Sequence, residues 1–177
     1  MQTTEDLKRR IRSAEDLLGV VKTMKALAAT SIRQYQRAVE SLAEYYRTVE
    51  LGLQIVLRKS RETPAPTGAK AAWLGAIVFG TDQGLCGQFN HLIAGHALDE
   101  MRKTGVPAEN RIIIAVGLRV ADLLEDSGQK AFEVLSPPGS TAGITPMVQD
   151  ITVLLEDWRF KRQIGQMHLF YHEYLSG

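Results

Sequence analysis

The feature that most constrains this chain is a row of apolar residues that repeats along its N-terminal third. The row advances in alternating steps of three and four residues, which is the 3.5-residue period of a coiled-coil seam. Its members are Leu7, Ile11, Ala14, Leu18, Val21, Ala28, Ile32, Tyr35, Val39, Leu42, Tyr46, Val49, Leu53 and Val56, with the charged Lys25 also in the row. At roughly 1.5 Å per residue, such a helix is about 75 Å long. The row therefore predicts a partner helix or several partner subunits, and a mechanical or assembly role.

The 177 residues have room for one compact domain beside this helix, and their charge is unevenly distributed. Residues 1–62 carry 12 Lys/Arg against 8 Asp/Glu, a net charge of +4, whereas residues 63–177 carry 9 against 12, a net charge of −3. Neither half has the dense basic face that nucleic-acid binding requires. The single cysteine, Cys86, excludes an internal disulfide, and no apolar run is long enough for a membrane span.

The sequence pattern divides the chain into three parts. We expect a long shaft helix over residues 1–59, a linker over 60–71, and an α/β domain over 72–177 that is incomplete at its C-terminus. The linker reads SRETPAPTGAKA, and its prolines and glycine end the helix.

Past the linker, short apolar runs alternate with segments of helical spacing. We expect strands over 72–79, 111–116, 131–135 and 166–175, and helices over 89–103, 118–126 and 144–160. This order predicts a small, three-layer, Rossmann-like domain with a mainly parallel sheet. In the last strand we expect one face to carry His168, Phe170, His172 and Tyr174.

The loop GTDQGLCG after the first predicted strand is the obvious place for ligand chemistry, but its residues do not support it. It lacks the G-x-G-x-x-G pattern of dinucleotide sites and the lysine followed by Ser/Thr of a P-loop. No base is placed by sequence to activate Cys86, and His168 and His172 are roughly 13 Å apart along a strand, too far to share a metal ion. We therefore predict no catalytic residue, cofactor or metal.

Two segments resemble the gamma subunit of F-type ATP synthases. LKRRIRSAEDLLGVVKTMKALAATSIRQYQRA, residues 7–38, is similar to the N-terminal helix of that family. The matching positions there are Arg10, Ile11, Ser13, Lys22, Met24, Lys25, Ala28, Ala29 and Arg33. TDQGLCGQFN, residues 81–90, looks like the family's Ser-Asp-Arg-Gly-Leu-Cys-Gly-x-Leu-Asn motif. It matches at Asp82, Gly84, Leu85, Cys86, Gly87 and Asn90.

The resemblance implies a non-catalytic rotor shaft. Its N-terminal helix would wind with the chain's own C-terminal helix inside a hexamer of alpha and beta subunits, and its α/β foot would contact the epsilon subunit and the membrane ring of c subunits. It would lie on the cytoplasmic face of the bacterial plasma membrane as a peripheral part of that complex. By resemblance, the rotor–stator contacts would be Arg10, Lys22, Met24, Lys25, Arg33, Asp82, Gly84, Leu85, Cys86, Gly87 and Asn90.

The chain also departs from the family pattern. Residues 17–21, Leu-Leu-Gly-Val-Val, replace a more polar stretch, Thr30–Ser31 replaces Ser-Lys, and Gln83 stands where a basic residue is common. The family continues for roughly another hundred residues that include the second shaft helix, so we expect this chain to be a fragment. We also expect its seam to be exposed, with a tendency to dimerise or aggregate.

Two other functions are compatible with parts of the pattern. One is a nucleotide-binding α/β sensor or enzyme with a helical dimerisation arm, against which the missing phosphate fingerprint counts. The other is a free coiled-coil adaptor, which would leave the GLCG loop unexplained.

Overall fold

The computed structural model describes residues 4–59, 73–162 and 164–173, and it separates into two compact units, Met1–Thr63 and Pro64–Gly177. Each unit is described by itself. The predicted linker over residues 60–71 and the predicted strand position of Tyr174 lie outside the described residues.

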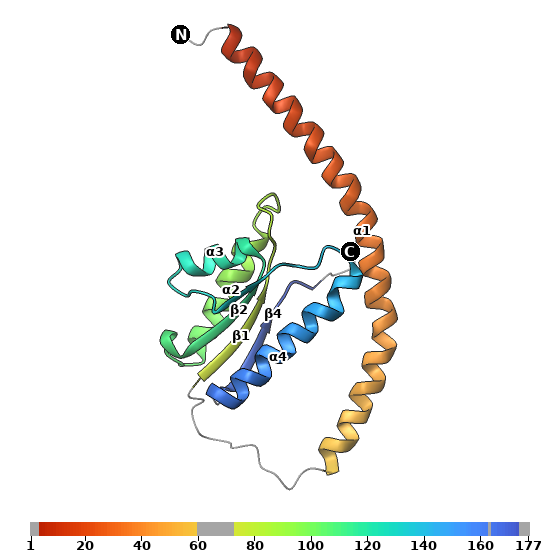
Figure 1. Cartoon of the computed structure of the whole chain (residues 1–177), viewed down its shortest axis with the longest axis vertical. Helices are drawn as coiled ribbons and strands as arrows, with labels where there is room; N and C mark the ends of the chain where they lie inside the picture. The colour runs from red at the N-terminus through yellow and green to blue at the C-terminus, as the bar shows by residue number, and fades with distance from the viewer. Residues whose placement is uncertain (1–3, 60–72, 163, 174–177) are drawn as a thin grey trace. The chain divides into compact units, whose positions relative to one another are not determined.

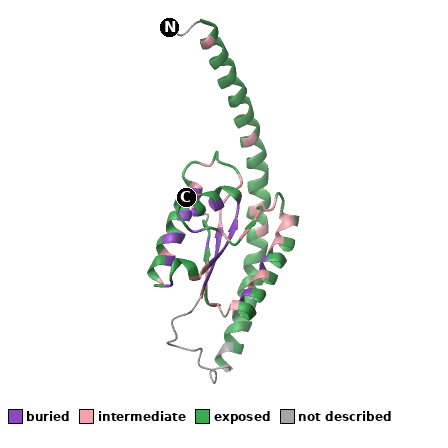
Figure 2. Ribbon diagram, turned by 60° about the vertical axis from the view of Figure 1, so that its left-hand side comes forward, coloured by how far each residue is buried: buried purple, intermediate pink, exposed green. Residues whose placement is uncertain are grey.

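The first unit consists of one helix, α1 (Thr4–Lys59), which is 56 residues long. Glu5 and Asp6 in its first turn place negative charge at the positive end of the helix dipole. Nearly all of its residues are exposed (Figure 2), and so are the large apolar members of the seam other than Tyr35. Leu18, for example, is 53% exposed. The helix therefore has no partner for its apolar side among the described residues of its own unit.

The second unit is built on a four-stranded parallel sheet (Figure 1). Its strands are β1 (Trp73–Phe79), β2 (Arg111–Val116), β3 (Glu133–Leu135) and β4 (Ile164–Phe170), in the order β3-β2-β1-β4. β1 is central and pairs in parallel with both β2 and β4. It is buried along most of its length because both faces of the sheet are covered, which explains its continuous apolar sequence.

Helices cover both faces of this sheet. The apolar side chains of α2 (Phe89–Lys103) and α3 (Leu118–Asp126) pack on one face, in a core that includes Leu74, Ile113 and Met101. On the other face α4 (Ile144–Arg162) packs Ile151 and Trp158 against β1 and β2. Two short 3₁₀ turns, Ala108–Asn110 and Thr141–Gly143, precede β2 and α4. The predicted α/β class with a parallel sheet and helices on both faces is confirmed.

Three aromatic side chains and Arg162 pack together on the face of the sheet that α4 covers. Trp158 is 1% exposed, and its ring meets the edge of Phe132 at 5.7 Å between centroids. The guanidinium of Arg162 lies 5.1 Å from the ring centre of Trp73 and 5.3 Å from that of Phe132. These cation–π contacts fix the C-terminal end of α4 over the start of β1.

The fourth strand differs from the prediction. It was expected over residues 166–175, but the structure places it at Ile164–Phe170, so His172 does not continue the strand face of His168 and Phe170. The His172 ring instead stacks on Phe89 with 3.9 Å between centroids, and its Nε2 donates a hydrogen bond to the Phe89 carbonyl at 3.0 Å. His172, which was predicted to lie in the strand, therefore contacts the start of α2 instead.

Candidate functional site

The candidate site is the loop between β1 and α2, which carries the second motif. It lies at the carboxyl end of β1, beside the turn from β2 into α3. Gly80 donates its N–H to the Val116 carbonyl at 2.8 Å, and Arg119 donates its N–H to the Thr81 carbonyl at 2.9 Å. Gly117 adopts φ +119°, and a Cβ there would lie 2.6 Å from the Thr81 nitrogen. Glycine is therefore required at this crossing of two backbones.

Asn90 holds the loop in place from the first turn of α2. This side chain is 4% exposed, and its Oδ1 accepts a hydrogen bond from the Thr81 N–H at 2.9 Å. Its Nδ2 donates to Thr81 Oγ1 at 2.8 Å and to Cys86 Sγ at 3.2 Å. Thr81 Oγ1 in turn donates to the Gln83 carbonyl at 2.7 Å. The buried amide is thus satisfied, and it fixes both ends of the loop.

Asp82 links the same loop to the next helix. Its Oδ1 accepts the backbone N–H of Leu118, the first residue of α3, at 2.8 Å. Together with the Thr81 carbonyl, it satisfies two amides that a helix start leaves free. The carboxylate also complements the positive end of the α3 dipole. The Asp82 carboxylate therefore occupies the place at the N-terminus of α3 where an anionic ligand would otherwise bind.

Cys86 has a structural environment. The residue is half-buried, and its Sγ donates to the Gln83 carbonyl at 3.4 Å and accepts from Asn90. Thr81 Oγ1 lies 3.6 Å away. None of these three partners can act as a base, so the contacts do not activate the thiol as a nucleophile.

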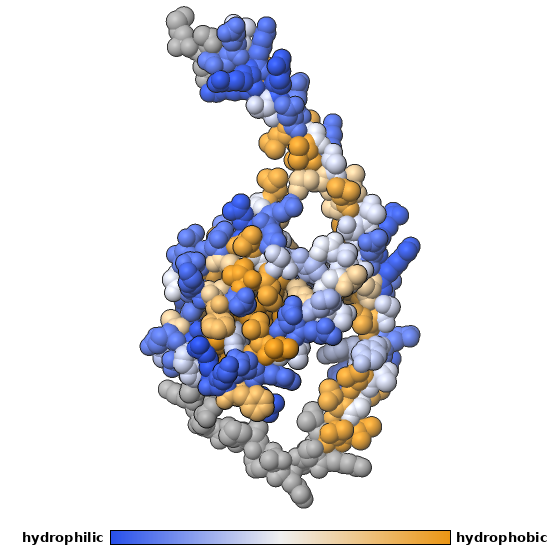
Figure 3. All heavy atoms as spheres, in the orientation of Figure 1, coloured by the Kyte–Doolittle hydropathy of each residue, from blue (hydrophilic) through white to orange (hydrophobic). Residues whose placement is uncertain are grey.

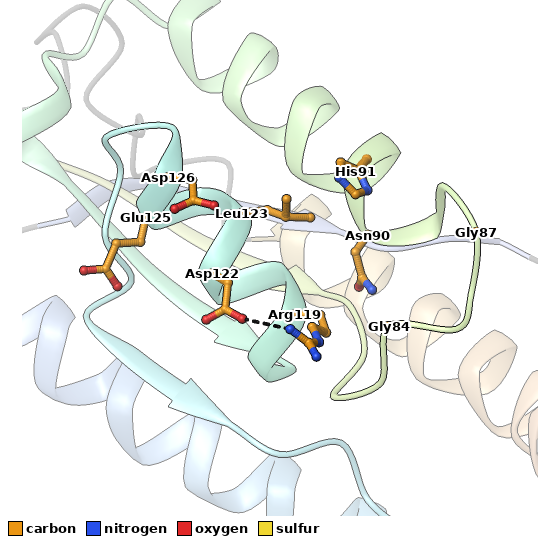
Figure 4. Close-up of a pocket in the computed structure, with 9 residues that line it drawn as sticks. All are labelled: Gly84, Gly87, Asn90, His91, Arg119, Asp122, Leu123, Glu125 and Asp126. Carbon is orange, nitrogen blue, oxygen red and sulfur yellow. Dashed lines mark ion pairs between the residues drawn. The ribbon is translucent and has the colours of Figure 1, made fainter. Parts of the chain in front are cut away.

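A shallow pocket of about 550 Å³ lies between the loop, the start of α2 and the outer side of α3 (Figure 4). Its lining consists of Gly84, Gly87, Asn90, His91, Arg119, Asp122, Leu123, Glu125 and Asp126. Arg119 lies 3.7 Å from the Asp122 carboxylate, and Glu125 pairs with Lys130 at 3.0 Å. The lining holds three carboxylates and one guanidinium, and its negative balance disfavours a phosphate ligand.

The ligand crevice of a doubly wound sheet is also blocked. In the order β3-β2-β1-β4 the winding reverses between β1 and β4, and ligands bind outside the carboxyl ends of strands at such a point. Here the His172 side chain, which follows β4, stacks on Phe89 at the start of α2. Together with Asp82 at α3, this contact argues against the nucleotide-binding alternative.

The surface that the loop offers to other molecules is small and apolar. Leu85 is 71% exposed at its tip, while Gln83, Gly84 and Gly87 are exposed beside it. The side chains of Asp82, Cys86 and Asn90 instead make hydrogen bonds within the unit that hold the loop in place. The arrangement is suited to contact with another surface and lacks the convergent polar groups of a reaction centre.

The other predicted site residues lie on α1. Arg10, Lys22, Lys25 and Arg33 are exposed, and Met24 is half-buried. Lys25 is the charged member of the apolar seam. The roles predicted for these residues and for the loop as rotor–stator contacts stay predictions, and the two groups belong to separately described units.

Sequence reasoning missed several residues that build the site. Thr81 lies inside the recognised motif but was not singled out, although it makes more of the loop's hydrogen bonds than Asp82 does. Arg119 was also missed, and His172 was considered only as a strand residue and as a metal ligand. Gly80 and Gly117 each come directly after an apolar strand. Their two matching positions could have predicted that the two backbones cross closely at this edge of the sheet.

Among the described residues, no helix has the length and apolar content needed to cross a membrane. The same residues contain no group of three His, Cys, Asp or Glu side chains arranged to hold a metal ion.

Comparison with known proteins gives one consistent family. The family model described as ATP synthase matches residues 3–177. The chain is 28% identical over 184 residues to the ATP synthase gamma chain of Desulforamulus reducens, covering 99% of this chain and 61% of the relative. It is also 28% identical over 187 residues to that of Phocaeicola vulgatus, covering 99% and 62%. With the gamma chain of Methylobacterium nodulans it shares 35% identity over 130 residues, 70% of this chain and 44% of the relative. The chain thus spans about three fifths of the length of the first two relatives.

Proposed function

This chain belongs to the ATP synthase family, among whose gamma chains its relatives fall, and from that premise we propose that it is the central shaft of a rotary ATP synthase. In this role it couples ion-driven rotation of a membrane ring to ATP synthesis or hydrolysis on the surrounding subunits. It performs no catalysis itself.

The observation that carries the proposal is the exposed apolar seam of α1. A stable helix buries such a seam against partners, and nothing in the described part of its own unit covers it. The loop between β1 and α2 supports the same role. Hydrogen bonds from its motif residues hold it in place, and it presents a surface for contact rather than a ligand site.

We assign the partners from the resemblance and from these surfaces. The seam of α1 pairs with the gamma chain's own C-terminal helix, and the pair lies within the hexamer of alpha and beta subunits. The α/β unit, residues 72–177 in the proposed division, is the foot that contacts the epsilon subunit and the c ring. The complex places the chain peripherally on the cytoplasmic face of the bacterial plasma membrane.

The test is an affinity purification of the tagged full-length protein from gently solubilised source membranes, with mass spectrometry of the co-purifying proteins. We expect alpha-, beta- and epsilon-type subunits in rotor stoichiometry, and ATPase activity in the eluate. Recovery of the chain alone, or as a simple homodimer, contradicts the shaft function.

A matched pair of variants makes this experiment specific to the seam. Leu42→Asp with Val49→Asp places two charges in the seam, whereas Thr23→Asp with Thr30→Asp places the same two charges on the opposite, polar side of α1. We expect the first pair to lose the co-purifying subunits and the second pair to retain them.

A further inference from the structure

Four side chains join three elements of the α/β unit at the end where its strands begin. The guanidinium of Arg162, the last residue of α4, lies 5.1 Å from the ring centre of Trp73 and 5.3 Å from that of Phe132. Trp158, one turn earlier in α4, meets the edge of the Phe132 ring at 5.7 Å between centroids. Trp73 is the first residue of β1, and Phe132 directly precedes β3. The cluster therefore connects β1, β3 and α4.

The charge of Arg162 is used for these aromatic contacts. Its neighbour Lys161 pairs with Asp157 at 2.6 Å, whereas no carboxylate in the described part of the chain forms an ion pair with Arg162. Arg162 is also half-buried. A guanidinium over an aromatic ring is attracted to it, and the attraction grows as the charge loses its hydration. The two rings are therefore the partners that the structure gives to this charge.

The backbone at Trp73 is held less regularly than the rest of β1. The pairing of β1 with β2 begins at Leu74, one residue later. On the other side Trp73 pairs with Ile164, but Leu74 pairs with Gln166, so the register shifts between them. Such a shift disrupts the ladder locally, and the end of a strand is where opening starts. The contact of Arg162 with the Trp73 ring adds a hold at this point that the ladder does not supply.

Trp73 also lies where the chain enters the α/β unit. Residues 60–72 join α1 to β1 in the sequence, so a force that passes along the backbone between the two units acts on Trp73 first. Exposed hydrophobic residues occur along α1 and also on the visible face of the α/β unit in Figure 3, and they mark no single point for such a force. The covalent connection does mark one.

We propose that Arg162 is a positioning residue that anchors the start of β1 against force transmitted between α1 and the α/β unit. The inference rests on the proposed shaft function, in which the two units turn together. Because Arg162 contacts both Trp73 and Phe132, a pull on the backbone at Trp73 is shared with α4 and β3. Without the charge, the same pull separates the start of β1 from β4, and part of the rotation deforms the domain.

Amide hydrogen exchange of the chain measures the anchor itself. Arg162→Met keeps a flexible apolar side chain but removes the charge, and we expect the amides of residues 74–76 to exchange about tenfold faster than in the parent. Arg162→Lys keeps a positive charge and should lie between the two. Arg159→Met makes the same change at an exposed position of α4 and is the matched control, with exchange expected to be unchanged.

Coupling in the assembled complex tests whether the anchor transmits force. Inverted membrane vesicles that contain the complex are supplied with ATP, and the initial response of a voltage-sensitive dye is divided by the rate of ATP hydrolysis. At equal amounts of assembled complex, we expect this ratio to fall about twofold in Arg162→Met. We expect Arg159→Met to keep the parent ratio and Arg162→Lys to recover part of it.

The outcomes separate this inference from the function on which it rests. If the amides of residues 74–76 exchange in Arg162→Met as they do in the parent, Arg162 does not hold the start of β1 and the proposal is wrong. Faster exchange with an unchanged coupling ratio also overturns it, because the residue then has only a structural role. If the parent chain is absent from a complex with ATPase activity, the shaft function itself fails.

Discussion

The two units of this molecule use the same apolar residues in opposite ways. Leu74 and Ile113 in the α/β unit are 0% exposed, whereas Leu18 and Ile32 in α1 are each 53% exposed. The α/β unit buries its apolar residues between a sheet and three helices, and so it contains its own source of stability. The apolar residues of α1 gain no such burial within the described part of their own unit. The comparison shows that the α/β unit holds its fold by burial within the chain, whereas the exposed residues of α1 do not contribute to stability in this way.

The largest expected effect comes from removing a leucine side chain in each unit. Leu74→Ala leaves a cavity in the sheet core and should lower the free energy of unfolding by about 2–5 kcal/mol. Leu18→Ala removes no buried contact within the described residues and should change it by less than about 0.5 kcal/mol. Both tryptophans, Trp73 and Trp158, lie in the α/β unit, so urea unfolding followed by tryptophan fluorescence reports that unit alone. Equal effects of the two substitutions would contradict the comparison.

We expect an intermediate effect at the loop between β1 and α2, which the buried Asn90 side chain holds in place. Asn90→Ala leaves the Thr81 N–H without its acceptor, removes the donor to the Thr81 hydroxyl oxygen, and should lower the free energy of unfolding by about 1–3 kcal/mol. Asn90→Asp keeps the acceptor for the Thr81 N–H, but it loses the donor and places a charge at a residue that is 4% exposed, so the free energy of unfolding should fall in this variant as well.

Amide hydrogen exchange at Thr81 provides the local measurement for these variants. We expect exchange to be fastest in Asn90→Ala. Gln88→Ala is the control, because Gln88 is exposed and its side chain makes no cap hydrogen bond to α2. Unchanged exchange in Asn90→Ala would show that the loop is held by other contacts.

The smallest effect is a pH dependence on the surface of α2. Lys103 donates a 2.6 Å hydrogen bond to Glu100, which together with its positive charge lowers the pKa of the Glu100 carboxyl below its ordinary value of 4.5. Because the folded pKa is lowered, the pair stabilises the fold above that ordinary value, and the contribution is lost as the pH falls through the lowered pKa. The pair is exposed, so solvent screening keeps the effect small.

Glu100→Gln tests this dependence. The variant should be slightly less stable than the parent at neutral pH and equally stable once the pH is below the lowered pKa, as measured by urea unfolding at both pH values. Lys103→Gln should have the same small effect, and the double variant should add little to either. A difference that grows as the pH falls has the wrong sign for this ion pair.

Much of the fold could be predicted from the sequence because its elements have strong local signals. The bounds of α2, β2 and α3 agree with the expected ranges 89–103, 111–116 and 118–126, each of which is followed by a glycine or polar residue. The end of β4 was predicted wrongly, because alternation along Phe170, Tyr171 and His172 is the same whether the strand continues or not. The tertiary contact of His172 with Phe89 decides it.

The candidate site was predictable in its residues but not in its connections. The motif identified Asp82, Cys86 and Asn90, yet the contact from Asp82 to Leu118 joins residues 36 apart and requires β1 and β2 to be neighbours. Sequence spacing does not contain that information. The pocket lining could not be predicted for the same reason, since it combines α2 and α3.

The bond from Asp82 to the start of α3 has a mechanical consequence. A loop fixed only at its two ends would deform when a force acts on its tip, and little of that force would reach the rest of the domain. This loop is anchored at Asn90 from behind and at Leu118 from the side, so it has little compliance. We therefore expect a force on Leu85 to be transmitted through these hydrogen bonds to α2 and α3 with little deformation of the loop.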